Sequence, residues 1–164
     1  MNDLKKKVEN LISLYKQKKY QQVEAISKNL LKENSELPIL YNILGLAQAD
    51  QHKSEDAIFT FKKGIKVKPN FALLYNNLGN IYKSQNKLVE AEKFYRECII
   101  KDKSIAEAYN NLANLLRGQN KNEEAINNYK KSLELNDSLF YSHYNLGITY
   151  ISLGNFIDAQ KSLE

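Results

Sequence analysis

The sequence predicts an all-α protein, an α-solenoid of about five stacked helix-turn-helix units. The first observation is a short pattern that returns every 34 residues: Tyr41-Asn-Ile-Leu-Gly45, Tyr75-Asn-Asn-Leu-Gly79, Tyr109-Asn-Asn-Leu-Ala113 and His143-Tyr-Asn-Leu-Gly147. The second is an alanine twelve positions after each pattern, at Ala57, Ala91, Ala125 and Ala159. The third is the three- and four-residue spacing of the apolar residues, which fits helices and not strands. Two sets of positions with the same period indicate repeated units that stack on one another.

The regular spacing has a physical cause in helix packing. Two helices that cross closely need a small side chain at the crossing, which Gly45 provides on the first helix and Ala57 on the second. Large residues then fill the space beside the crossing: Tyr41, Leu44, Phe61, Tyr75, Leu78, Tyr82, Tyr95, Tyr109, Leu112, Leu116 and Tyr129. A third small position, at Gly64, Cys98 and Ser132, is expected where one unit meets the next.

The helices are expected in pairs along the chain. A degenerate first pair covers residues 4–16 and 20–33, with Asn10-Leu11 in place of Leu-Gly. The later helices are expected at residues 37–51, 54–67, 72–85, 88–101, 106–119, 122–135 and 140–153, followed by a helix that the end of the chain at Glu164 cuts short. Neither proline interrupts a helix, because Pro38 begins one and Pro69 lies in a connector. Ser104 and Glu107 are expected to begin a helix as a capping box.

These residues resemble the tetratricopeptide repeat (TPR), whose pattern is Leu-Gly, Tyr, Ala, Phe and Pro at set distances. The second unit follows that pattern best, with Leu44-Gly45, Ala57, Phe61, Gly64 and Pro69. The resemblance covers essentially the whole chain and implies a right-handed solenoid, residues 1–164, as a single domain. Its repeats would span about residues 4–37, 38–71, 72–105, 106–139 and an incomplete 140–164.

Composition and charge agree with this class and argue against others. The chain is 43% hydrophobic and 26% charged, and its single cysteine excludes an internal disulfide. No signal peptide or membrane span is evident, which favours a cytoplasmic protein. The net charge of +5 raises the question of nucleic acid. The lysines of the chain alternate with acidic residues and lack interleaved aromatic residues, so we do not expect nucleic acid as the ligand.

The sequence predicts no catalytic residue, metal ligand set or cofactor. Cys98 falls at a small packing position, His52 in a turn between helices, and His143 in the place of a packing aromatic. No phosphate-binding glycine loop, Gly-x-Ser-x-Gly elbow or Cys-x-x-Cys pair is present. We therefore expect these residues to form a binding protein and not an enzyme.

In the TPR family the first helix of each unit lines a concave groove, which implies a set of candidate binding residues. The positions beside the Leu-Gly pair are polar and repeat in phase: Asn76, Asn77, Asn80, Asn110, Asn111, Asn114, Tyr144 and Asn145, with Lys83 and Arg117 one turn further. An asparagine side chain offers one acceptor and two donors, so it can pair with both polar groups of a peptide unit whatever the ligand's sequence.

Asn77, Asn111 and Asn145, here called the asparagine ladder, resemble the groove of the TPR arm in O-GlcNAc transferases and related bacterial glycosyltransferase or sulfotransferase fusions. Ile43 replaces the asparagine in the second unit, which would shorten the ladder. An abundance of asparagine throughout the chain, as at Asn127 and Asn128, is the alternative explanation.

The prediction is therefore a scaffold that holds an extended peptide or partner segment. An alternative is the N-terminal targeting arm of a larger transferase, a glycosyltransferase, sulfotransferase or methyltransferase, whose catalytic domain follows residue 164. Self-association through uncapped end faces is a third hypothesis, since solenoids need caps to cover their apolar ends.

Overall fold

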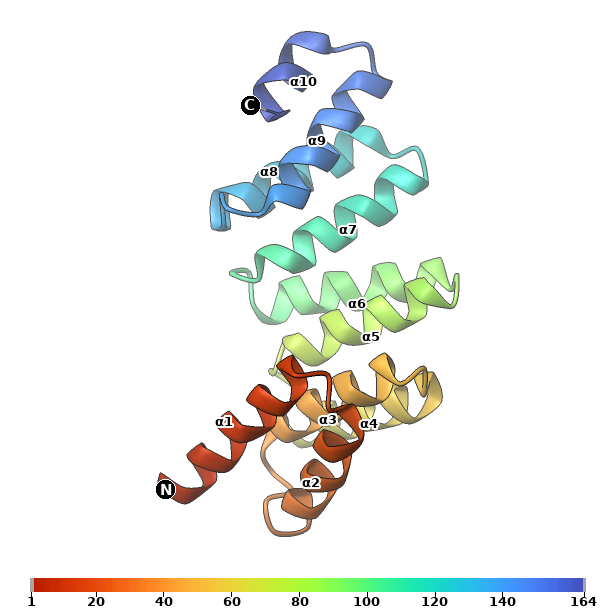
Figure 1. Ribbon diagram of the computed structural model, residues 1–164. Coiled ribbons are helices and arrows are strands. Elements are labelled where there is room, and N and C mark those ends of the chain that lie inside the picture. Colours follow the sequence, from red (N-terminus) through yellow and green to blue (C-terminus); the bar gives the residue numbers. More distant parts are fainter. Residues whose placement is uncertain (1, 164) are drawn as a thin grey trace. The chain divides into compact units, whose positions relative to one another are not determined.

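The computed structural model describes residues 2–163, which fold into ten helices without a strand (Figure 1). Their bounds are α1 Asn2–Lys16, α2 Tyr20–Glu33, α3 Pro38–Asp50, α4 Ser54–Val67, α5 Leu73–Ser84, α6 Leu88–Lys101, α7 Ala106–Gly118, α8 Asn122–Leu135, α9 Phe140–Ser152 and α10 Phe156–Leu163. Every predicted helix is confirmed, with ends that differ by no more than two residues. Pro38 is at the start of α3 and Pro69 lies in a connector, as predicted.

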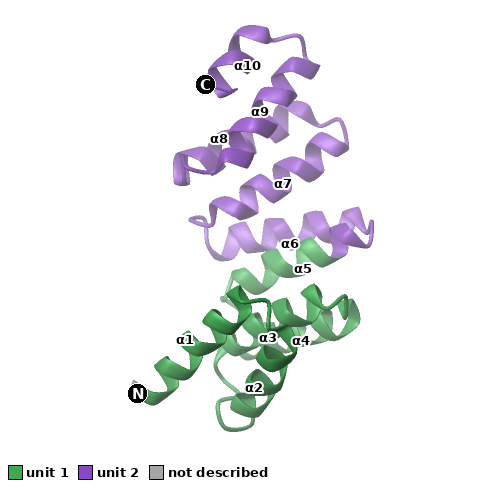
Figure 2. Cartoon of the chain, viewed as in Figure 1, with its two compact units in different colours: residues 1–81 green, residues 82–164 purple. Residues whose placement is uncertain are grey.

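The chain divides into two compact units, residues 1–81 and 82–164, with the division inside α5 (Figure 2). In the first unit, α1 packs on α2 and on α3, and α3 packs between α2 and α4. Leu11, Val23, Leu40 and Ala47 are fully buried members of one hydrophobic cluster in this unit. The predicted crossing is also present here, because the ring of Phe61 lies directly over Gly45.

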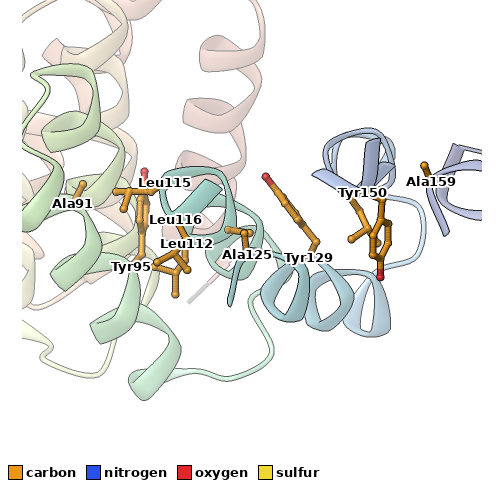
Figure 3. Packing of buried hydrophobic residues seen from close by; sticks show 11 residues of the cluster. Ala91, Tyr95, Leu112, Leu115, Leu116, Ala125, Tyr129, Tyr150 and Ala159 are labelled. Atoms are coloured by element: carbon orange, nitrogen blue, oxygen red, sulfur yellow. The ribbon is translucent and has the colours of Figure 1, made fainter. Parts of the chain in front are cut away.

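In the second unit, buried side chains from α6 to α10 form one continuous hydrophobic cluster (Figure 3). The small residues Ala91, Ala113, Ala125 and Ala159 alternate in it with Tyr95, Leu112, Leu116, Tyr129 and Tyr150. Ser132 occupies the third small position, and its hydroxyl donates to the Ala106 carbonyl at 2.8 Å and lies 3.1 Å from the Ser142 hydroxyl of α9. This position therefore joins one helix pair to the next, as predicted.

The turn inside each helix pair contains one residue with a positive φ, and these residues are also 34 apart. They are Lys18, His52, Asn86 and Asn120, with φ between 58° and 61°, and Gly154, with φ 74°. The left-handed region is costly for residues with a Cβ, and glycine or asparagine tolerates it best. The degenerate first pair therefore has the same turn as the others, although its Leu-Gly pair is missing.

The connectors between pairs differ from the prediction. The capping box at Ser104 and Glu107 is wrong, because α7 begins after Ile105 and no side chain caps it. The Ser104 amide and hydroxyl instead donate to Asp102 Oδ1, at 2.9 and 2.6 Å. Ser138 makes the same two bonds to Asn136 one period later. These turns lie one and two periods after Pro69 of the second pair. Asp and Asn suit them, because their side chains can accept a hydrogen bond from the backbone amide two residues later.

Candidate functional site

The most unusual polar group in the second unit is a pair of cations at the ends of two helices. Lys83 lies in the last turn of α5 and Arg117 in the last turn of α7, one period later. A helix C-terminus favours positive charge, which explains both positions. Burial and the neighbouring Arg117 charge both lower the pKa of Lys83. The charge of Arg117 therefore disfavours the protonated form of Lys83.

Acidic residues do not neutralise this pair. Within residues 2–163, no ion pair includes Lys83 or Arg117. The Nε atom of Arg117 is buried and has no hydrogen-bond acceptor in the described chain. A buried donor without an acceptor costs free energy, so such an atom indicates a place for water or for a bound anion.

Two further polar side chains lie beside this pair. The Tyr129 hydroxyl donates to Asn114 Oδ1 at 2.7 Å. Burial raises the pKa of Tyr129, while the Arg117 charge opposes part of that rise, so Arg117 lies near the phenol. The Asn114 amide nitrogen has no acceptor within residues 2–163. Its two N–H donors are therefore available to a ligand.

The helix α9 contributes Asn145 and two exposed aromatic rings. The Asn145 side chain is half-buried and makes no hydrogen bond among the described residues, while its backbone carbonyl accepts from Thr149. Tyr144 is 48% exposed and stacks on Phe140 at 6.3 Å between ring centroids. On α7, Asn111 is half-buried, and the Asn110 amide oxygen accepts from Ser142 at 3.1 Å.

In the first unit the predicted asparagines have different surroundings. Asn77 donates to Asn42 Oδ1 at 2.7 Å, so part of its amide is used inside the protein. Asn76 is buried and Asn80 is exposed. Sequence reasoning missed Asn42, although it lies one period before Asn76. Whether these asparagines contact a ligand stays a prediction.

Glu24, Cys98 and His143 are held by contacts within the protein. Glu24 is buried; although burial opposes ionisation, hydrogen bonds from Lys28, Lys53 and Gln51 lower its pKa to about 2. Cys98 is fully buried at its packing position, and His143 lies 3.0 Å from the Asp137 carbonyl. Within residues 2–163, no three His, Cys, Asp or Glu side chains lie together as a metal site.

In the same part of the chain, no helix is both long enough and apolar enough to cross a bilayer.

Comparison with known families agrees with the fold. A family model described as "Tetratricopeptide repeat" matches residues 72–104, and one described as "TPR repeat" matches residues 113–154. No curated protein sequence matches the chain.

Solved structures with similar folds have low sequence identity to this chain. A crystal structure of MamA is 20% identical over 92% of this chain and 88% of its own, with a TM-score of 0.77. PilF from Pseudomonas aeruginosa is 16% identical over 96% and 72%, with a TM-score of 0.87. YrrB, described as a TPR protein with an unusual peptide-binding site, is 17% identical over 95% and 80%, with a TM-score of 0.68. These neighbours confirm the predicted all-α solenoid class; the resemblance to transferase arms stays a prediction.

Proposed function

Because the chain is a tetratricopeptide-repeat protein, we propose that it is a non-catalytic scaffold that binds an extended, acidic segment of a partner protein. The binding surface in the second unit comprises Lys83, Asn111, Asn114, Arg117 and Asn145. The same proposal extends, by sequence period alone, to Asn76, Asn77 and Asn80 in the first unit, and to Asn110 and Tyr144 in the second.

The observation that carries this proposal is the Lys83 and Arg117 pair, which has no acidic partner among residues 2–163. Two neighbouring like charges, of which Arg117 is half-buried, destabilise each other, and an anion bound between them would relieve that repulsion. A carboxylate on the partner would also give the buried Arg117 Nε its missing acceptor. The expected ligand therefore has acidic side chains.

The asparagines would hold the ligand's backbone. The Asn145 amide and the Asn114 N–H donors make no other hydrogen bond within the described chain, so each can pair with a peptide group. The helices α7 and α9 that carry them pack directly on each other. Affinity would be modest, because an unstructured segment loses conformational freedom on binding. The printed description of YrrB supports peptide binding as a use of this fold.

The test measures fluorescence polarisation of a labelled octapeptide of alternating aspartate and serine. The double variant Lys83→Gln and Arg117→Gln should weaken binding by at least about tenfold, since two charge-assisted contacts are lost. The matched control removes the same charge from two exposed lysines of this unit, Lys93→Gln with Lys103→Gln, and should change affinity by less than about twofold. Equal losses in both double variants would reject the site and leave only nonspecific attraction.

A second variant separates the asparagines from the cations. The double variant Asn111→Ala with Asn145→Ala should lower the affinity for an all-serine peptide and for the acidic peptide by the same factor. Backbone contacts do not depend on the ligand's charge. Unchanged binding of both peptides, with an unchanged melting temperature, would remove the asparagines from the site.

A further inference from the structure

The first unit contains a cavity of about 430 Å³ that the proposed peptide surface does not use. It lies between α2 and α4, and α3 forms its floor through Tyr41, Leu44 and Gln48. A helix turns by about 100° per residue, so these three positions share one side of α3. Position 43, the equivalent of the asparagine ladder in this repeat, points to the opposite side. The cavity is therefore separate from the ladder positions.

One pair of side chains that lines the cavity is smaller than the pair at the same positions of the next repeat. Gln48 on α3 and Thr60 on α4 form a buried hydrogen bond, with 2.7 Å between Thr60 Oγ1 and Gln48 Oε1. One period later the same positions hold Tyr82 and Phe94, which stack with ring centroids 5.3 Å apart. Two aromatic rings occupy far more volume than an amide and a hydroxyl. The third repeat therefore has more side-chain volume at this position than the second repeat has.

The lining combines apolar surface with positive charge. Phe59 is 61% exposed at the cavity, which is costly for a phenylalanine, whereas the same position one period later is Lys93. Leu31 and Leu44 add further apolar surface. The ammonium of Lys63 lies 4.6 Å from the centre of the Phe59 ring.

The charges around the cavity are not balanced. Its lining includes three lysines, Lys28, Lys32 and Lys63, and one acid, Asp56. Lys28 is paired with Glu24 at 2.7 Å. Lys32 and Lys63 belong to no ion pair within the described residues. An occupant with an apolar side chain and negative charge would complement this lining.

We propose that this cavity is a second binding site, which takes a short acidic peptide segment of a partner protein with one large apolar side chain. The apolar side chain enters between Leu31, Leu44 and Phe59, and flanking carboxylates meet Lys32 and Lys63. The volume suits this occupant, since ligand pockets start at about 300 Å³ and one aromatic residue fills much of such a space. The site does not depend on Lys83, Arg117 or the asparagine ladder.

The test follows backbone amide shifts by NMR while a blocked pentapeptide, one phenylalanine between two pairs of aspartates, is added. Saturable shifts should appear at Lys32, Phe59, Thr60 and Lys63. The same peptide with alanine in place of phenylalanine should bind at least about tenfold more weakly, because an aromatic side chain contributes more than 1.4 kcal/mol on burial. A peptide with lysines in place of the aspartates should give no saturable shift.

The chain's own third repeat provides the decisive variant. Gln48→Tyr with Thr60→Phe copies Tyr82 and Phe94 into the cavity and should abolish the saturable shifts. A second variant, Phe59→Lys, changes only an exposed side chain to the residue at position 93 and should weaken binding at least about tenfold. The double variant Lys32→Gln with Lys63→Gln should also weaken binding at least about tenfold, and should reduce the salt dependence of binding.

Three outcomes would overturn the proposal. The first is an absence of saturable shifts up to millimolar peptide. The second is binding that Phe59→Lys leaves unchanged, and the third is displacement of the peptide by oligouridylate, which would indicate a site for nucleic acid. Lys83→Gln with Arg117→Gln separates the two proposals, because it should leave these shifts unchanged even where it abolishes binding at the second unit.

Discussion

At the scale of single residues, close packing at a few small positions limits what each repeat can accept. A Cβ atom built on Gly45 would lie 2.3 Å from the Phe61 ring, and one on Gly147 would lie 2.6 Å from Leu163. The same position is alanine in the fourth repeat, where Ala113 is fully buried. This helix-crossing position therefore tolerates a methyl group only where the facing helix leaves room for it.

Gly45→Ala should destabilise the protein by about 1–3 kcal/mol, because the Phe61 ring is fully buried and would have to shift to admit the added methyl group. Urea unfolding followed by circular dichroism measures this change. Gly118→Ala is the matched control, since a Cβ there meets no atom within 4 Å, and it should leave the protein as stable or slightly more stable. A Gly45→Ala protein with an unchanged midpoint would contradict the packing argument.

Acid should weaken the first unit through Glu24. Its pKa is lowered to about 2 in the folded protein, against about 4.3 in an unfolded chain, so its contribution is complete above the unfolded value. That contribution is lost as the pH falls from about 4 to about 2. Glu24→Gln should cost about 1–2 kcal/mol at pH 7, because Lys28 and Lys53 are half-exposed and solvent screens them.

The difference between the Glu24→Gln protein and the unchanged protein should then disappear near pH 2. Denaturant unfolding at pH 7, 4 and 2 measures it. Glu33→Gln, at the exposed end of the same helix, should differ little from the unchanged protein at every pH. A constant difference for Glu24→Gln down to pH 2 would show that its ionisation does not stabilise the fold.

At the scale of helices and turns, the 34-residue period made most of the fold predictable. Helix ends were accurate because small and aromatic residues mark the same places in each repeat. Side-chain hydrogen bonds that the repeat pattern does not specify were not predictable: Ser104 bonds to Asp102 in place of the predicted capping box, and Asn77 donates to Asn42. The cavity was not predicted either. Its sign in the sequence is that Gln48 and Thr60 stand where the next repeat has the larger Tyr82 and Phe94.

The turns offer a test at this scale. Lys18 holds a φ of 60° without the side-chain chemistry that makes this region tolerable, so Lys18→Gly should stabilise the protein by about 1 kcal/mol. Thermal unfolding measures the change. Lys19→Gly, at the neighbouring residue with φ −82°, should instead destabilise it by about 0.5–1 kcal/mol, because glycine gains freedom only in the unfolded chain. The same sign for both variants would argue against the turn as the cause.

At the scale of the whole molecule, the net charge of +5 favours acidic partners at both proposed sites. Salt screens this attraction, since the Debye length falls from about 10 Å at 0.1 M to about 3 Å at 1 M. Affinity for the aspartate and serine octapeptide should therefore fall several-fold over this range, and affinity for an all-serine peptide should stay within about twofold. Polarisation titrations at the two salt concentrations measure this, and equal salt dependence of both peptides would exclude charge as the basis of selection.

The only cysteine of the chain, Cys98, is fully buried in α6 of the second unit. A thiol reagent can reach its sulfur only when that helix transiently opens, so the modification rate reports how often it does so. Because the chain has no second thiol, the rate of modification measures local opening of α6 alone. A partner that binds and stabilises the second unit should lower this rate.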